Sequence, residues 1–574
     1  MPKGRPVARV TITEEQRFEL QSWSRRPKTT QALCVVAFLT ALASMRPYAA
    51  AQPNVLVPFP TQQTAPTSIA PTIRVYSRET IVDVLVTDDK GQPVRGLTQS
   101  DFAVEEDGQP QPIRSFYEYD KTTSPAPART LPPNTYTNSI ALPANGPVQI
   151  ILFDRIASAP ADLQRSKQYI ADYLRSMPAG TEVVLFKLSP SKGLVLLLDF
   201  TTDGKAAAAT VESLDVEWIS EPGAGLPDAI AASHMIAAYV AGVKGRKNLV
   251  WVLPGSPPTI MHDGGLSWGI TDMTLVHRLM DLYDIFTREQ IAIYPLDPRG
   301  VHDLGRTPTE QFNALMTQNV ADETGGAISN SNDYQGTIAN ITDSTLHAYT
   351  LSFIPPRPAE DGHYHTVTIK LDRPGLHLSY RPGYNDEQPN SPDPALIHDM
   401  IQGPMRLGAI PSTQILFDLH VELASSVVQP AKTPVSTSAP PHTKGAPYDA
   451  VFTFDPTQIA LTETPDGVRT ASIELDLGAY DFYGKLVATR SQTFKIAVTP
   501  AQYNGFYRTP LKFSLPIDLP RGQLTLRAGL FDTATNKAGT LELPLTVGKK
   551  AAAKPDNPPA PSGPKPASES KVNQ

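Results

Sequence analysis

Residues Val148–Asp154 form a largely apolar run that closes on an acid, and Ser158 follows four residues later. A short apolar run closed by a polar turn is typical of a buried central strand of a parallel sheet. In open α/β sheets, binding groups gather just past the carboxyl ends of such strands. Two interpretations of Asp154 and Ser158 follow: they are the remains of a metal site, or they are only the polar border of a sheet.

Strand-like and helix-like stretches alternate from residue 148 to about residue 355. Apolar runs predict further strands at residues 183–188, 194–200, 248–253, 291–296 and 349–353. Apolar stripes at helical spacing predict helices at residues 161–177, 206–214, 227–243, 272–290, 309–324 and 333–345. This alternation predicts a doubly wound, mostly parallel sheet with helices on both faces. In it, residues 194–200 add an antiparallel edge and residues 349–353 form the closing strand.

The segments that flank this α/β unit have the period of two that is typical of β-strands. The last of them has regular turns between its strands, which predicts a β-sandwich. Stretches rich in Pro, Thr, Ser or Asn separate the parts and are interpreted as linkers. The predicted organisation in chain order is a signal peptide 1–51, linker 52–72, small β module 73–120, linker 121–147, central α/β domain 148–355, β-hairpin extension 356–390, linker 391–413, β-sandwich 414–548 and disordered tail 549–574.

The N-terminus has the order of a secretory signal peptide. Arg25, Arg26 and Lys28 precede an apolar run at residues 32–43, and small residues follow at 49–51. We therefore expect an exported protein, periplasmic or extracellular after cleavage, with no transmembrane span in the mature chain. An uncleaved N-terminal anchor is the alternative. The only cysteine, Cys34, lies inside this segment, so the mature chain would have no disulfide and no cysteine-based zinc site.

The net charge and the motifs of the sequence argue against several classes of function. The net charge of −7 gives no basic excess, which argues against general nucleic-acid binding through phosphate neutralisation. No phosphate-binding loop, nucleophile elbow, zinc-protease helix motif or dinucleotide fingerprint occurs in the sequence. Acidic residues are scattered, and no nucleophile is paired with a base. The sequence therefore predicts a protein that is not an enzyme.

Three groups of residues resemble a known family. They are the segment 86–97, which reads VTDDKGQPVRGL, the turn Glu106–Gly108, and the arginine-proline-glycine sequences at residues 373–375 and 381–383. With the strand that ends at Asp154, they resemble the secreted VWFA-related family first described from acidobacteria. The central unit resembles a von Willebrand factor A domain. The resemblance covers roughly residues 73–384 and implies an exported protein with a role in adhesion or complex assembly.

The resemblance also implies where a metal ion would bind. A-domains that bind metal use an Asp-x-Ser-x-Ser loop, a Thr from a second loop and an Asp after a later strand, which together suit a hard cation such as Mg²⁺. Here Asp154 and Ser158 remain, but Ile156 replaces the middle Ser. Ala224 stands where the Thr is expected and Pro254 where the later Asp is expected. We therefore expect a degenerate loop without metal, and no cofactor.

Other metal sites remain open as alternatives. Arg155 places a positive charge beside Asp154. Without a metal ion, the Asp154 carboxylate would either pair with Arg155 or cap the next helix. Asp297, after a later strand, could act as a replacement ligand for Mg²⁺, although the Pro and Arg that follow it favour a turn. His363 and His365 are predicted to share a strand face near Asp361, a set that could bind a transition metal or simply be an exposed pair.

The main hypothesis is a non-enzymatic exported protein whose A-like domain binds an unknown protein or cell-surface partner. Two alternatives stay open. One is a metal-dependent adhesin with a site rebuilt around Asp297. The other is a hydrolase with its site in a loop such as residues 263–269.

Overall fold

The structure of the protein is a computed structural model. The described residues are 79–90, 92–118, 130–140, 148–155, 160–189, 192–215, 226–253, 285–299, 317–328, 332–345, 347–355, 363–385, 403–424 and 445–548. The predicted signal peptide, the 52–72 linker and the 549–574 tail lie outside these residues. Within the described residues, every helix is too short or too polar to cross a membrane.

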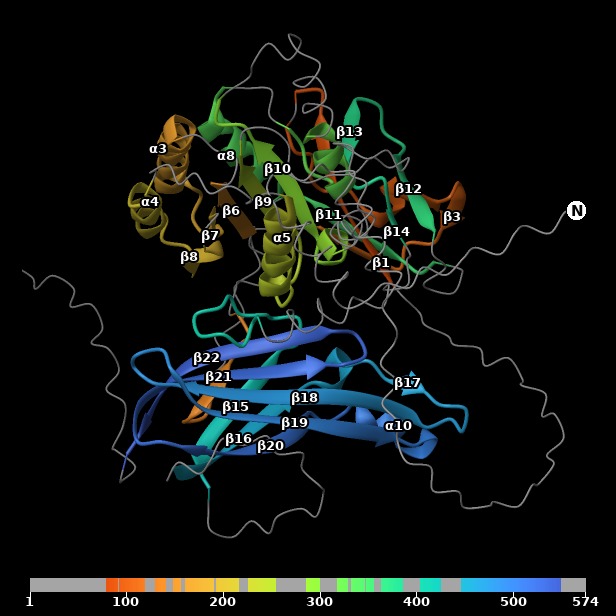
Figure 1. Ribbon diagram of the computed structural model, residues 1–574. Helices are drawn as coiled ribbons and strands as arrows, with labels where there is room; N and C mark the ends of the chain where they lie inside the picture. The colour runs from red at the N-terminus through yellow and green to blue at the C-terminus, as the bar shows by residue number, and fades with distance from the viewer. Residues whose placement is uncertain are drawn as a thin grey trace, which may run out of the picture. The chain divides into compact units, whose positions relative to one another are not determined.

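The central sheet is built from five strands around the opening apolar run (Figure 1). Their bounds are β6 Val148–Asp154, β7 Glu182–Ser189, β8 Gly193–Thr201, β9 Lys247–Val252 and β10 Ile291–Leu296. The order across the sheet is β10-β9-β6-β7-β8, and only the edge strand β8 is antiparallel to its neighbour. Every residue of β6 is buried, as a strand with neighbours on both sides and helices on both faces requires.

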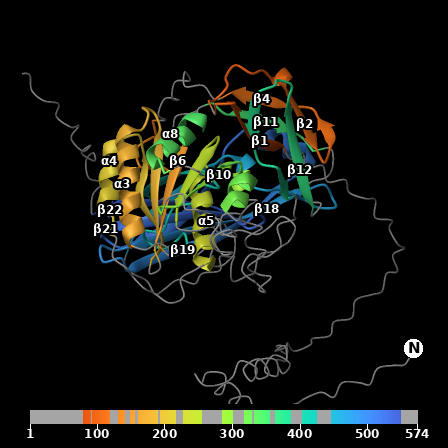
Figure 2. The same ribbon diagram turned by 90° about the horizontal axis from the view of Figure 1, so that it is seen from above.

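Helices cover both faces of this sheet, as Figure 2 shows from above. Their bounds are α3 Pro160–Ser176, α4 Gly204–Glu212, α5 Leu226–Val240 and α8 Tyr334–Thr345. Because side chains alternate along a strand, Ile151 and Phe153 pack with α3, α4 and α8, whereas Ile150 and Leu152 pack with α5. The mixed α/β class predicted from the sequence is confirmed for the central unit.

The strand predicted to close the central sheet belongs elsewhere. β11 (Tyr349–Phe353) pairs antiparallel with β1 (Thr80–Asp88) and with β4 (Ser115–Glu118). Its Tyr349, Leu351 and Phe353 are fully buried against valines of β1 and aromatic rings from 102 and 116. The prediction was therefore wrong for this strand, because apolar partners from the N-terminal segment bury its side chains.

The small β module and the β-hairpin extension, predicted as separate parts, form one two-sheet unit. The remaining strands of this unit are β2 Phe102–Glu106, β3 Gln109–Gln111, β12 Tyr364–Leu371, β13 Leu376–Ser379 and β14 Gly383–Asn385, with a short helix η1 Gln99–Asp101. Its sheets have the orders β13-β1-β11-β4 and β14-β12-β2-β3. The chain thus leaves this unit after β4 and returns to it at β11, after the central domain.

The C-terminal part is a sandwich of two antiparallel sheets around a continuous apolar core. One sheet contains β5 Thr135–Thr137, β15 Phe417–Leu423, β16 Ala446–Phe454 and β20 Leu511–Leu519. The other contains β17 Thr462–Glu463, β18 Arg469–Tyr480, β19 Leu486–Val498, β21 Gly522–Asp532 and β22 Lys537–Val547, with short helices η3 Pro456–Gln458 and α10 Pro500–Phe506 nearby.

Two stretches predicted as linkers contribute to the folded parts. β5, from the 121–147 linker, adds an edge strand to the sandwich by pairing with β15. Thr413, at the end of the 391–413 linker, donates its amide to the carbonyl of Ala238 at 2.8 Å and accepts the amide of Gly242 at 2.7 Å. The segment before β15 is therefore hydrogen-bonded to the end of α5.

Candidate functional site

Asp154 ends β6 on the face of the sheet that also carries Ile150 and Leu152. Its side chain is only 4% exposed, and Oδ2 accepts a hydrogen bond from the indole Nε1 of Trp251 at 3.2 Å. Trp251 lies in the neighbouring strand β9 and is fully buried. One carboxylate oxygen of Asp154 is thus already bound by a neutral donor inside the domain. Ser158, Ile156, Ala224 and Pro254 lie outside the described residues.

Positive charge collects near the carboxyl ends of β6 and β7. Arg155 follows β6 directly, and its amide donates to the carbonyl of Leu188 at 2.9 Å. Burial lowers the pKa of the Lys187 ammonium, and the charges of Arg155 and Lys192 lower it further against the opposing charge of Asp215. Arg155, Lys192 and Asp215 therefore all lie within electrostatic range of Lys187.

Sequence reasoning identified Arg155 but missed Lys187 and Lys192. The signal for Lys187 was present, because it is the single charged residue inside the otherwise apolar stretch Val183–Leu188. A lysine that interrupts a buried strand near its carboxyl end must direct its ammonium to the border of the sheet. Lys192 lies in the turn before β8 and is exposed.

Asp297, the potential replacement ligand, is held in a local turn. Its Oδ1 accepts the backbone amide and Nε of Arg299, each at 2.9 Å, and its Oδ2 lies 2.6 Å from the terminal nitrogen of the same guanidinium. Its carbonyl accepts the hydroxyl of Tyr334 at 2.7 Å. Both carboxylate oxygens of Asp297 are therefore bound to the guanidinium of Arg299. This is the local turn that the Pro and Arg after Asp297 predict.

The predicted pair of histidines does not share one environment. β12 begins at Tyr364, so His363 precedes the strand and is exposed, whereas His365 is only 6% exposed. The Nδ1 of His365 lies 2.7 Å from Oδ2 of Asp107. Burial opposes ionisation of Asp107, but hydrogen bonds from His365 and Thr366 outweigh it and lower the pKa of this carboxyl. Asp361 lies outside the described residues.

In the parts of the chain that the structure describes, no three His, Cys, Asp or Glu side chains gather where they could hold a metal ion. The loop 263–269, considered for a hydrolase, lies outside the described residues.

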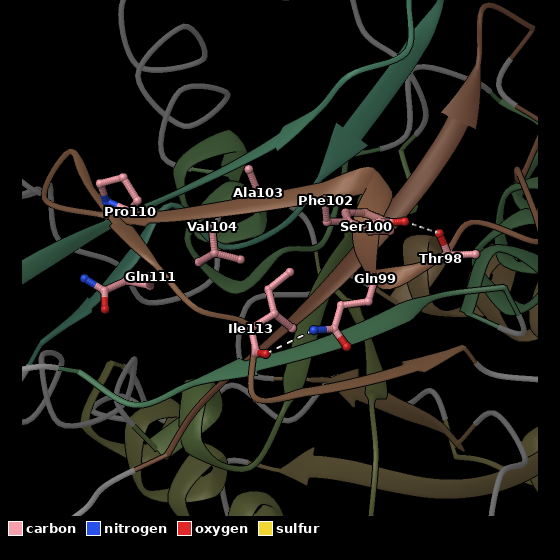
Figure 3. A pocket seen from close by; sticks show the side chains of 9 residues that line it. All are labelled: Thr98, Gln99, Ser100, Phe102, Ala103, Val104, Pro110, Gln111 and Ile113. Atoms are coloured by element: carbon pink, nitrogen blue, oxygen red, sulfur yellow. Dashed lines mark hydrogen bonds between the residues drawn. The ribbon is translucent and has the colours of Figure 1, made fainter.

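A hollow of about 590 Å³ lies on the two-sheet β unit and was not anticipated from the sequence. Figure 3 shows the side chains that line it, which are Thr98, Gln99, Ser100, Phe102, Ala103, Val104, Pro110, Gln111 and Ile113. Gln99 donates to the carbonyl of Ile113 at 3.1 Å, and the hydroxyls of Thr98 and Ser100 lie 2.9 Å apart. The lining includes no carboxylate, imidazole or amine, so these nine residues offer no general base for catalysis.

The similarity of the chain to known proteins is confined to solved structures. The chain matches no family model and no curated protein. Among solved structures it is similar to the conserved hypothetical protein BatB from Bacteroides thetaiotaomicron, with 18% identity over 35% of this chain and 98% of that chain, and a TM-score of 0.24. It is also similar to a von Willebrand factor type A protein from Catenulispora acidiphila, with 9% identity over 51% of this chain and 75% of that chain, and a TM-score of 0.24. Similarity at this level identifies no family.

Proposed function

We propose that the chain is an exported, non-enzymatic interaction protein whose A-like central domain binds a protein or cell-surface partner without a metal ion. The observation that carries this proposal is the hydrogen bond from Trp251 to Asp154. The residue that would be the first metal ligand is buried and already has a donor from the adjacent strand. The sequence resemblance and the order of the central sheet, with its antiparallel edge strand β8, support the A-like assignment.

The charge at the border of the sheet supports a metal-free contact. In a metal-dependent A-domain, the cation supplies the positive charge that attracts a carboxylate of the partner. Here Arg155, Lys187 and Lys192 lie at the same end of the strands, with Asp215 as the opposing charge. Cationic side chains form charge-assisted hydrogen bonds with carboxylates, so an acidic group on the partner is the chemistry that fits.

The two alternatives have less support. A rebuilt metal site would need Asp297, whose oxygens are bound to Arg299. A hydrolase site in the loop 263–269 would lie outside the described residues, and the hollow on the β unit offers no general base among its lining residues. We therefore favour the interaction protein over both.

Reversing one charge at this border tests the proposal. We expect the intact chain, crosslinked to its native envelope, to capture a specific partner, and the exposed-turn variant Lys192→Glu to recover about 5-fold less of it at low salt. The variant Lys205→Glu is the matched control, because Lys205 is an exposed lysine on α4. Equal recovery with both variants would exclude this border as the contact, and recovery of no partner by the unmodified chain would remove the support for an interaction protein.

A further inference from the structure

The hairpin between β18 and β19 presents two aromatic rings to solvent. Phe482 is 84% exposed and Tyr483 is 90% exposed. The other exposed large hydrophobic side chains among the described residues fall between 36% and 47%. Exposure this complete is costly for adjacent aromatic residues, and large exposed apolar groups mark interaction sites.

The turn that carries these rings is fixed by its own hydrogen bonds. Oδ1 of Asp481 accepts the amides of Tyr483 and Lys485, each at 2.9 Å. The amide of Gly484 donates to the carbonyl of Asp481 at 2.9 Å, and Gly484 adopts a φ of +77°, which favours glycine. The two rings lie edge to face with centroids 5.6 Å apart. The tip therefore holds its rings outward before any partner arrives, which lowers the entropic cost of binding.

Two apolar and two cationic side chains lie beside the turn or in the segment that contacts the base of the hairpin. Leu407 and Leu486 are 38% and 47% exposed, and a Cβ at Gly484 would lie 3.4 Å from Leu407. The hydroxyl of Tyr480 donates to the carbonyl of Met405 at 3.0 Å, which places the segment containing Arg406 against the base of the hairpin. Arg406 and Lys485 are both exposed. The acid of the turn itself, Asp481, has an oxygen directed inward to backbone amides.

We propose that this hairpin tip inserts its two rings into the interfacial layer of an anionic lipid bilayer. Tyr and other amphipathic aromatic rings prefer the depth of the lipid headgroups, and exposed cations beside them attract anionic headgroups. A second protein fits less well, because a stable protein interface buries about 800 Å² per partner and needs a broad complementary surface. The two exposed rings, with Arg406 and Lys485 nearby, fit a soft and negatively charged lipid layer better than they fit a protein surface. This contact does not depend on the partner site of the central domain.

Flotation of the intact chain with phosphatidylglycerol-containing vesicles tests the proposal. We expect the unmodified chain to float with these vesicles and not with phosphatidylcholine vesicles. The double variant Phe482→Ser with Tyr483→Ser should lose at least about 10-fold in bound fraction. The control Leu423→Ser, at another large exposed hydrophobic residue, should bind as the unmodified chain does. Absence of flotation of the unmodified chain, or equal flotation of the double variant, would overturn the proposal.

Fluorescence of a tryptophan introduced at the tip is a second measurement of insertion. This variant keeps an aromatic ring at position 482. In Phe482→Trp, the added fluorescence should shift to shorter wavelength with anionic vesicles and be quenched by brominated lipid, relative to the unmodified chain. An unshifted and unquenched signal would contradict insertion.

Sedimentation velocity tests the alternative occupant of the tip, which is a second copy of the chain. If the unmodified chain dimerises through the tip and does not bind vesicles, the lipid proposal is wrong.

Discussion

Replacement of Arg527 by Ala should lower the free energy of unfolding of the C-terminal sandwich by about 3 kcal/mol, the lower end of the range for removal of one partner of a buried ion pair, because the side chain of Glu542 is 31% exposed. Arg527 lies in β21 directly opposite Glu542 of β22 and is only 1% exposed. Its NH1 donates to Glu542 at 3.1 Å, and its Nε donates to the carbonyl of Pro404 at 2.7 Å. Burial lowers the pKa of Arg527, and the charge of Glu542 opposes this shift.

The same arginine holds residues 403–410 against the outer face of the sheet. Glu542 also accepts the amide of Gly408 at 2.9 Å, and Met405 packs with Phe531 and Ala538. Truncation to Ala would leave the carbonyl of Pro404 without this donor and Glu542 without its cation, which is the costly outcome for partly buried polar groups. We therefore expect loosening of residues 403–410 together with β21.

Hydrogen exchange is the suitable readout for Arg527→Ala. The four tryptophans of the chain all lie outside residues 403–548, so their fluorescence does not report on the sandwich. Amides of β21 and of residues 403–412 should exchange faster in Arg527→Ala. The control Arg521→Ala removes an exposed arginine from the turn before β21 and should change stability by less than about 0.5 kcal/mol. A loss below about 1 kcal/mol in Arg527→Ala would contradict the anchoring role.

Replacement of Asp476 by Asn should stabilise the sandwich at pH 8 by up to about 3 kcal/mol and have little effect below pH 4. Asp476 lies in β18, is 7% exposed, and its Oδ1 has no hydrogen-bond partner among the described residues. Burial raises the pKa of this carboxyl to about 6, the hydrogen bond from Ser491 lowers it, and the charge of Glu474 raises it. At neutral pH the folded chain therefore contains a desolvated carboxylate.

The sign of this pH dependence follows from proton binding. In the folded chain the carboxyl of Asp476 keeps its proton up to about pH 6, whereas in the unfolded chain it releases the proton near pH 3.8. The folded state binds more protons between these values, so stability is highest below the lower pKa and falls as the pH rises through the higher one. Asn cannot ionise, so the advantage of Asp476→Asn should grow across this window and stay constant above it.

Scanning calorimetry at pH 5 and pH 8 measures the effect of Asp476→Asn. The melting temperature of the sandwich transition should rise by roughly 10 °C at pH 8, and by clearly less at pH 5. The control Asp518→Asn alters an exposed carboxylate of β20 and should shift the transition by less than about 2 °C. Equal shifts of Asp476→Asn at both pH values would show that burial of the charge is not the cause.

Much of the central sheet could be predicted from the sequence because its strands are continuous apolar runs. β6 and β10 begin and end within one residue of the predicted bounds, and β6 has no exposed residue. The same reasoning misplaced β11, since its residue types fit a parallel strand equally well. Its true neighbour β1 lies more than 200 residues earlier in the chain, and local periodicity contains no information on such distant pairing.

Short elements in polar surroundings could not be predicted either. β5 has three residues in a stretch rich in Pro, Thr and Asn, and only pairing with β15 makes it a strand. Residues 403–413 have linker-like composition, yet they are fixed by Arg527 and by the end of α5. In both cases, long-range contacts decide the structure over local propensity.

In the candidate site, too, the sequence predicts where a residue lies along its strand but not which side chain it contacts. The place of Asp154 at the end of a buried strand follows from the apolar run before it. Its bond to Trp251 depends on the register of β6 against β9, which no motif encodes. The sequence could therefore identify missing metal ligands, but not the donor that binds the remaining carboxylate.

Titration calorimetry with Mg²⁺ and Mn²⁺ on the intact chain tests the central claim most directly. A metal-free A-like domain predicts no binding tighter than about 1 mM for either ion, and identical traces for the unmodified chain and Asp154→Ala. The variant Asp297→Ala serves as the control for a rebuilt site. Tighter binding that disappears in Asp154→Ala or in Asp297→Ala would contradict the claim and establish a metal-dependent site.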